Sequence, residues 1–319
     1  MAKSQQADCH FFTPPVNITM KWTLFLLSLI STISSDITDH LKRCENKSGY
    51  HGIHNIDFIY LINLDQRPEK LTRTLDQLSN YGIYPYRFSA VNGWELTIDA
   101  INDVGVKYYP EMNGGLMATC YHDSAFVPSH EIIQNYEQNY FCHCMSRGAI
   151  GIALSHISIL QDAFDSGYET IWVMEDDIDV IRNPKILSDL IGKLDLLDKS
   201  WDVLFTDVDI HDNNGNYYTT YYAGKRPDYQ STNNFALKNR INEDFIKVGA
   251  RSGAHSMILR KSGIKKLLQF FKAHQIFLPY DMDYILPSSI KLYTVTQDVV
   301  SNTPRAPSDN GGPNYLNKR

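Results

Sequence analysis

An apolar segment, an amphipathic helix and a second apolar segment, in that order, restrict the possible folds of this chain more than any other feature. Residues 56–64 read IDFIYLINL, and this run of branched and aromatic side chains predicts a buried strand. Pro68 stands where a helix can begin, and Gly82 where it can end. A second strand is predicted over residues 84–93. This order favours an α/β fold around a mostly parallel central sheet.

The alternation of elements continues along the chain. Helices are predicted over residues 146–167 and 185–197, and strands over residues 168–177 and 201–210. Residues 95–147 are less regular, and we expect loops and short elements there. In an α/β sheet, ligands bind at the carboxyl ends of the strands, so polar residues that follow the strands should meet at one edge.

The ends of the chain differ from the predicted domain, which covers residues 54–302. Residues 1–47 are expected to be a leader, in which Met20–Ser35 (MKWTLFLLSLISTISS) has the order of a secretory signal peptide. Its apolar stretch of about 12 residues is too short, at roughly 18 Å as a helix, to span a bilayer core of about 30 Å. A membrane-associating anchor and a disordered leader are the alternatives. Residues 303–319, rich in Pro, Gly and Asn, are expected to be a loose tail.

The leader bears on the location of the protein, and the overall charge bears on its partners. We expect the protein to enter the secretory pathway or to associate with a membrane, and a place at the cytoplasmic face of a membrane is an alternative. The net charge is −6 and no cluster of Lys and Arg stands out, so nucleic acid is not an expected partner.

The cysteines allow more than one interpretation. Cys120 and His122, together with Cys142 and Cys144, could form a zinc site, but their spacing matches none of the common ligand patterns. A disulfide is the alternative for an exported protein. Free, partly buried thiols are the favoured interpretation.

Three carboxylates, Glu175, Asp176 and Asp177, directly follow the apolar residues WVM. Adjacent like charges repel, and a buried carboxylate is costly unless something pairs with it. Glu175 and Asp177 can share one face, because residues i and i+2 of a strand do. They are therefore candidate ligands for Mn²⁺ or Mg²⁺, which would in turn hold a diphosphate, with Asp177 as the preferred direct ligand. A solvated turn or a helix N-cap cluster is the alternative.

Four blocks of the sequence resemble, in order, those of glycosyltransferase family 25. They are FIYLINLDQRPEKLTRT (58–74), GAIGIALSHISIL (148–160), VMEDDI (173–178) and GAHSMILRKSG (253–263). The family includes bacterial lipooligosaccharide galactosyltransferases and collagen hydroxylysine galactosyltransferases. The resemblance extends from about residue 56 to about residue 300. Met257 and the irregular stretch 113–144 depart from the family pattern, which leaves the sugar and the acceptor open.

The resemblance implies a GT-A type (Rossmann-like) nucleotide-sugar transferase fold, a UDP-sugar donor, dependence on Mn²⁺ and inversion at the anomeric carbon. The donor-binding residues that it implies are Asn63, Arg67, Ser155, His156 and Asp176. The implied metal ligands are Glu175, Asp177 and His255. For Arg67 the alternative is an ion pair with a helix carboxylate, and for His156 and His255 it is a structural role.

An inverting transfer also needs a base that takes the proton of the acceptor hydroxyl. Asp281 is the chosen candidate, with Asp283, Asp207 and Asp209 as alternatives; a helix N-cap after Pro279 would be the structural role of Asp281. The expected function is transfer of a hexose, most often galactose, from a UDP-sugar to a glycan or glycolipid such as lipopolysaccharide or lipooligosaccharide. Transfer to collagen-like hydroxylysine and an inactive, exported protein that binds carbohydrate or nucleotide are the alternatives.

Overall fold

The computed structural model describes residues 36–122, 127–212, 214–218 and 224–317. The chain divides into two units, residues 1–34 and 35–319, and only the second is described here. The signal-like segment Met20–Ser35 lies outside the described residues. Among the helices that are described, none combines the length and the apolar character needed to cross a membrane.

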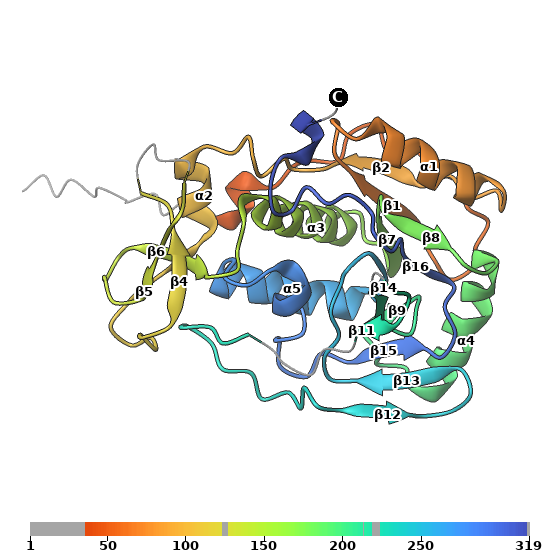
Figure 1. The fold of residues 1–319 in the computed structure, drawn as a ribbon. Helices are drawn as coiled ribbons and strands as arrows, with labels where there is room; N and C mark the ends of the chain where they lie inside the picture. Colours follow the sequence, from red (N-terminus) through yellow and green to blue (C-terminus); the bar gives the residue numbers. More distant parts are fainter. Residues whose placement is uncertain (1–35, 123–126, 213, 219–223, 318–319) are drawn as a thin grey trace, which may run out of the picture. The chain divides into compact units, whose positions relative to one another are not determined.

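A mixed β-sheet forms the centre of the second unit (Figure 1). Within the described residues it has eight strands in the order β12-β13-β15-β9-β14-β7-β1-β2. Their bounds are β1 (Phe58–Asn63), β2 (Tyr86–Ser89), β7 (Thr170–Glu175), β9 (Val203–Phe205), β12 (Lys238–Arg240), β13 (Phe245–Val248), β14 (Ser256–Arg260) and β15 (Leu292–Val295). Pairing is parallel for β2 with β1, β1 with β7, and β9 with β15, and antiparallel for the other neighbouring pairs.

The expectation of a mostly parallel sheet is therefore wrong. Every antiparallel pair involves β13 or β14, which run against the other strands. The reversal begins at the link 241–244 between β12 and β13, which is too short for a helical crossover and so joins them as an antiparallel pair. The neighbours β2, β1 and β7 follow the expected parallel pattern.

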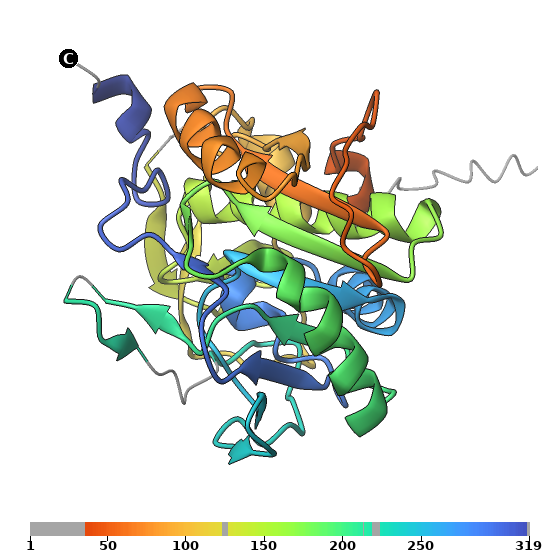
Figure 2. The same cartoon turned by 90° about the vertical axis from the view of Figure 1, so that its right-hand side faces the viewer.

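Helices cover both faces of this sheet (Figure 2). On one face, α1 (Pro68–Ser79) and α4 (Leu187–Leu197) pack on Ile59, Leu61 and Trp172, and on the other, α3 (Arg147–Asp165) and α5 (Lys261–His274) pack on Tyr60 and Ile62. The side chains of β1 thus alternate between the two layers, as the period of a strand requires. The apolar core consists of these two layers.

A close approach positions α3 against the loop after β2. A Cβ atom on Gly151 would lie 2.5 Å from the backbone nitrogen of Gly93, and one on Gly93 would lie 1.8 Å from the carbonyl oxygen of Arg147. Neither contact leaves room for a side chain, so both glycines are needed for this packing. The loop at residues 90–94 is thereby fixed beside the first turns of α3.

A smaller sheet and several short elements complete the unit. The second sheet has the order β3-β6-β4-β5 and belongs to the stretch 95–147, which was expected to be irregular. The remaining bounds are η1 (Ile37–His40), α2 (Ile98–Val104), β3 (Val106–Lys107), β4 (Met117–Cys120), β5 (Ser129–Ile132), β6 (Asn139–Cys142), β8 (Ile178–Val180), η2 (Pro184–Ile186), β10 (Ile210–His211), β11 (Tyr217–Tyr218), α6 (Tyr280–Asp283), β16 (Val300–Asn302) and η3 (Asn314–Asn317).

Residues 36–47, which the sequence analysis assigned to the leader, contact the rest of the unit. Ile37 is buried in the core beside the α3 and α5 layer. The backbone N–H of Lys42 donates to Ser158 Oγ over 2.9 Å, and Lys47 Nζ donates to Asp162 Oδ2 over 3.0 Å.

Candidate active site

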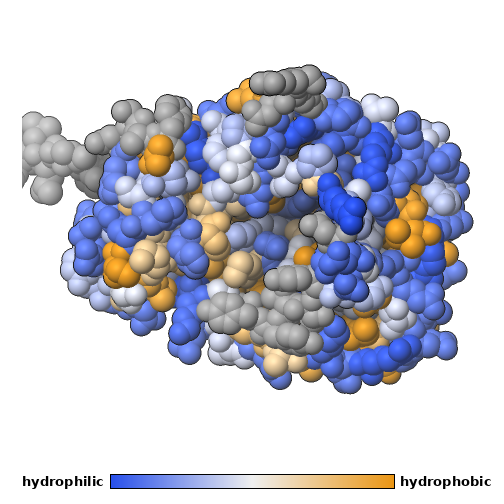
Figure 3. Space-filling view, viewed as in Figure 1, coloured by the Kyte–Doolittle hydropathy of each residue, from blue (hydrophilic) through white to orange (hydrophobic). Residues whose placement is uncertain are grey.

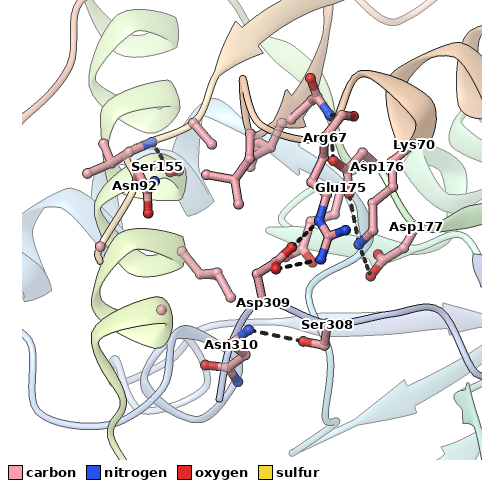
Figure 4. Close-up of a pocket in the computed structure, with 18 of the residues that line it drawn as sticks. Arg67, Lys70, Asn92, Ser155, Glu175, Asp176, Asp177, Ser308, Asp309 and Asn310 are labelled. Atoms are coloured by element: carbon pink, nitrogen blue, oxygen red, sulfur yellow. Dashed lines mark hydrogen bonds and ion pairs between the residues drawn. The ribbon is translucent and has the colours of Figure 1, made fainter. Parts of the chain in front are cut away.

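A pocket lies where β1 and β7 end, beside the first turns of α1 and α3 (Figure 4). It encloses about 670 Å³ of empty space, a volume that includes the part open to solvent. Its walls come from five segments, namely residues 62–70, 90–94, 148–155, 175–177 and 308–310. The space-filling view shows that this side of the molecule is hollowed near its centre and largely hydrophilic at its surface (Figure 3).

Asn63 joins the ends of the two parallel strands. Its side chain is buried, and its Nδ2 donates to Asp176 Oδ2 over 2.6 Å and to the carbonyl of Arg67 over 2.9 Å. Its Oδ1 accepts from Arg87 Nε over 2.9 Å. The residues after β1 and the residues after β7 are thus brought to one edge of the sheet, as the α/β pattern predicts.

Arg67 binds a carboxylate from the far end of the chain. Its Nε and one terminal nitrogen donate to the two oxygens of Asp309 over 2.5 and 2.6 Å, and both side chains are almost completely buried. Glu69, a carboxylate of α1, lies farther from Arg67, at 3.4 Å. Trp94 Nε1 donates to the carbonyl of Asp309 over 2.8 Å, which fixes the tail segment across the pocket.

Glu175, the last residue of β7, and the two aspartates that follow it contact two different partners. Glu175 Oε1 lies 2.9 Å from His156 Nε2, and the His156 ring stacks on Tyr280 with centroids 4.2 Å apart. Asp176 and Asp177 each face Lys70, whose Nζ lies 3.5 and 3.6 Å from their oxygens. All three acidic residues line the pocket, and the buried His156 holds Glu175 from the side of the core.

The charges of this cluster shift the three acids differently. Burial opposes ionisation of Glu175, but the hydrogen bond and charge of His156, with the charges of His255 and Lys70, leave its pKa below the usual value. Burial raises the pKa of Asp176 to about 6, despite the charge of Lys70. Burial and the charge of Glu175 also raise the pKa of Asp177. The charge of Lys70 lowers the pKa of both aspartates but does not offset the effect of burial.

The remaining expected residues have partners of their own. Ser155 accepts from the N–H of Val91 over 2.9 Å and donates to the carbonyl of Gly151 over 2.7 Å, so it braces α3 against the pocket loop. His255 Nε2 lies 2.8 Å from Asp207 Oδ2, beneath the site. The carbonyl of His255 accepts from the N–H of Glu175 over 2.9 Å.

The expected metal ligands differ in their contacts. Glu175 lines the pocket and contacts His156, and His255 contacts Asp207. Asp176 and Asp177 offer carboxylate oxygens in the pocket, and burial is the largest cause of their raised pKa values. Carboxylate oxygens are ligands that fit Mn²⁺ or Mg²⁺.

A profile of the family described as Glycosyltransferase family 25 (LPS biosynthesis protein) matches residues 56–285, more than half of the chain. This chain belongs to glycosyltransferase family 25. A Glycosyltransferase 25 family member of Aedes aegypti is 29% identical to it over 123 residues, which cover 39% of this chain and 16% of that protein. The Inactive glycosyltransferase 25 family member 3 of Homo sapiens is 25% identical over 183 residues, which cover 57% of this chain and 26% of that protein.

The family 25 chain thus matches only a part of these relatives. The match to a Glycosyltransferase 25 family member of Drosophila melanogaster is similar, at 28% identity over 145 residues, 44% of this chain and 19% of that protein. In each case the matched region is about a quarter of the relative's length or less.

The four candidate bases of this family 25 chain differ in their burial and in their ion pairs. Asp283 is buried against Arg226, 2.6 Å away, and Asp207 is buried against Arg251 and His255, so both are held in ion pairs. Asp209 is also buried, and accepts from the N–H of Ile210. Asp281 is half-buried and accepts from the N–H of Gly253 over 3.0 Å, with no ion-pair partner within the described residues. Burial, partly offset by that N–H, raises its pKa.

Two charged residues of the pocket, Lys70 and Asp309, were not expected from the sequence. Lys70 lies one turn after Arg67 on α1, where a lysine reads as an ordinary exposed helix residue. Asp309 stands in the Pro/Gly/Asn-rich tail, 242 positions from its partner Arg67. The residues PEK after β1 could have identified Lys70 as a pocket residue. No neighbouring sequence feature identifies Asp309.

A pH titration of stability tests the environment of Asp176. Because the folded state holds its proton more tightly than the unfolded chain, this group makes the free energy of unfolding fall as the pH rises from about 4 to about 6. Asp176→Asn should flatten this slope. The contribution that it removes from the free energy of unfolding over this pH range is no more than about 3 kcal/mol. Urea unfolding at several pH values measures the effect. Equal slopes for the wild type and Asp176→Asn would contradict the raised pKa.

Proposed function

We propose that this chain transfers a hexose, with galactose as the proposed sugar, from a UDP-sugar to an acceptor hydroxyl. The transfer inverts the anomeric carbon and takes place in a GT-A type site assisted by Mn²⁺ or Mg²⁺. One observation carries the proposal. In a family 25 chain, Asn63, Lys70, Asp176 and Asp177 converge on one pocket at the carboxyl ends of β1 and β7. This is the position at which α/β sheets bind nucleotides.

The pocket residues would divide the binding of the donor. Asp176 and Asp177 would hold the cation, with Glu175 kept in place by His156 behind them. A bound divalent cation supplies positive charge that stabilises the departing diphosphate. Asn63 keeps the two strand ends together, and Ser155 fixes the loop that forms the opposite wall. Arg67 is available to an anionic donor group once Asp309 releases it.

Asp281 is the proposed base. In the transfer, the acceptor oxygen forms a bond to the anomeric carbon, the bond from that carbon to the diphosphate oxygen breaks, and the proton of the acceptor hydroxyl passes to a carboxylate.

Asp281→Asn removes the carboxylate that would take this proton, and the amide can occupy the same space. We expect transfer to fall by about 10²-fold, with donor binding unchanged. Donor affinity from calorimetry and the transfer rate are measured together, and Asp209→Asn is the matched variant; equal losses in both variants would exclude Asp281 as the base.

A panel of UDP-sugars tests the donor and the metal. The purified chain is incubated with UDP-galactose, UDP-glucose and UDP-N-acetylglucosamine, and the release of UDP is followed with Mn²⁺, with Mg²⁺ and with a chelator. We expect turnover of UDP-galactose with Mn²⁺ and none with the chelator. Turnover that is equal in the chelator would contradict metal dependence, and a preference for another UDP-sugar would change the proposed hexose.

The acceptor has two candidates, as the resemblance implied. The family description names LPS biosynthesis, which favours a lipopolysaccharide or lipooligosaccharide acceptor, whereas the relatives compared above come from insects and mammals and favour a protein hydroxyl such as collagen-like hydroxylysine. Radiolabel from the preferred UDP-sugar is offered to both acceptors in parallel, and the labelled product identifies the acceptor. Association with a membrane or the secretory pathway remains an expectation from Met20–Ser35.

A second function is supported by a specific observation. Lys70 places its amine between Asp176 and Asp177, where a cation would bind, and one relative is named as inactive. A chain that binds a nucleotide sugar without transferring the hexose would have this arrangement. Calorimetric binding of the UDP-sugar, together with no release of UDP under any metal, would favour this function over transfer.

A further inference from the structure

A second cluster of metal-ligating side chains lies outside the proposed donor pocket. Among the described residues, Cys120, His122 and Glu131 are the one group of three such residues whose ligand atoms all lie within 4.8 Å of one another. Cys120 Sγ lies 3.2 Å from His122 Nε2, and His122 Nε2 lies 3.9 Å from Glu131 Oε2. Figure 1 shows β4 and β5, which carry Cys120 and Glu131, well apart from β1 and β7.

The register of β4 and β5 brings this cluster together. Cys120 pairs with Ser129 and Ala118 with Glu131, so Cys120 and Glu131 are diagonal neighbours on one face of the hairpin. His122 follows Cys120 by two residues, the spacing that returns a side chain to the same face of an extended chain. Thr119 and His130 pair on the opposite face, where their side chains contact each other over 3.2 Å.

The distances are close to those of a tetrahedral zinc site. Zinc bonds of about 2.0 to 2.3 Å at tetrahedral angles place neighbouring ligand atoms roughly 3.3 to 3.6 Å apart. The two observed separations, 3.2 and 3.9 Å, differ from this range by a few tenths of an ångström. The exposed side chain of His122 can rotate by that amount, because about half of its surface is open to solvent.

Hydrogen bonds from neighbouring side chains hold Glu131 in place, as is usual for a carboxylate that binds a metal ion. Its Oε1 accepts from Tyr140 OH over 2.9 Å and from Gln138 Nε2 over 3.0 Å. These two bonds orient the carboxylate and leave Oε2 directed at His122. Such outer partners fix the orientation of first ligands and raise metal affinity.

We propose that Cys120, His122 and Glu131 bind one Zn²⁺ ion, with water as the fourth ligand. A thiolate and an imidazole favour zinc over Mn²⁺ and Mg²⁺, which take oxygen ligands. The site is therefore distinct in chemistry, as well as in position, from the proposed donor site. Its ion links β4 to β5 and so stabilises the smaller sheet.

Metal titration of the full chain tests this proposal without any measurement of transfer. The protein is stripped with a chelator, and Zn²⁺ binding is followed by elemental analysis after equilibrium dialysis, with Co²⁺ absorption as a reporter of thiolate ligation. We expect one Zn²⁺ per chain and a thiolate-to-cobalt charge-transfer band. His122→Ala, which changes a side chain about half exposed to solvent, should bind Zn²⁺ at least about tenfold more weakly. Cys120→Ser should lose the band.

Matched variants separate this site from its neighbours. His130→Ala changes a histidine of the same hairpin on the opposite face, Cys144→Ser changes an exposed thiol, and Asp177→Asn changes the donor pocket; all three should keep both the stoichiometry and the band. Wild-type affinity in His122→Ala, a band that persists in Cys120→Ser, or no equimolar binding by the wild type would overturn the proposal. Failure of the proposed transferase activity would leave these readouts unchanged.

Discussion

Asp177→Ala is expected to reduce sugar transfer by at least about 10³-fold while the chain stays folded. The side chain lines the pocket and is one of the two carboxylates that fit a divalent cation there. Burial and the charge of Glu175 raise the pKa of Asp177, so its ionised form is disfavoured in the folded chain. Removing it relieves that repulsion, and the melting temperature should stay the same or rise. The loss of activity is therefore expected without a loss of stability.

The measurement combines the rate of UDP release with thermal unfolding of the same preparations. Asp179→Ala is the matched control, because Asp179 follows in the same segment but pairs with Arg73 and does not line the pocket. We expect Asp179→Ala to retain transfer. Substantial turnover by Asp177→Ala would remove Asp177 from the mechanism, and a fall in its melting temperature would show that the residue stabilises the fold.

Asp207→Ala is expected to lower the free energy of unfolding by about 3 to 5 kcal/mol. Asp207 is fully buried and contacts Arg251, His255 and Ser301, so its removal leaves the buried guanidinium of Arg251 without its ionic partner. Burial opposes ionisation of Asp207, but the charges of Arg251 and His255 outweigh it and keep its pKa below the usual value. The stability from this group is therefore present at neutral pH and lost as the pH falls through that lowered pKa.

Urea unfolding followed by tryptophan fluorescence at neutral pH measures the effect. Asp209→Ala is the control, because Asp209 is buried on the same segment and its pKa is raised by burial. It should cost much less than Asp207→Ala. A loss below about 1 kcal/mol for Asp207→Ala would contradict the ion-pair interpretation and reopen Asp207 as a candidate base.

The elements that follow from local pattern were predictable. The strand expected over residues 56–64 corresponds to β1, and the helix between Pro68 and Gly82 corresponds to α1, which ends at Ser79. Apolar period and helix-ending residues act over a few positions, so the sequence shows them directly. The direction of β13 and β14 was not predictable in this way, because it depends on the β12–β13 hairpin and on pairing between strands far apart in the chain.

The candidate site shows the same division. The meeting of the segments after β1 and β7 follows from the carboxyl-end rule, and the 2.6 Å bond between Asn63 and Asp176 is its result. The partners of His156 and His255 did not follow, because a buried imidazole can turn toward any acceptor that packing brings within reach. Here packing brings Glu175 to the first and Asp207 to the second.

The position of β15 bears on how a shortened form of this protein should be designed. The family profile matches residues 56–285, but β15 begins at Leu292 and lies in the middle of the sheet, between β13 and β9. An expression fragment trimmed to the region of similarity would have a gap inside its sheet and would expose two unsatisfied strand edges, a known cause of aggregation. Trimming after residue 302 would preserve the sheet but delete Asp309 and the wall that it forms over Arg67.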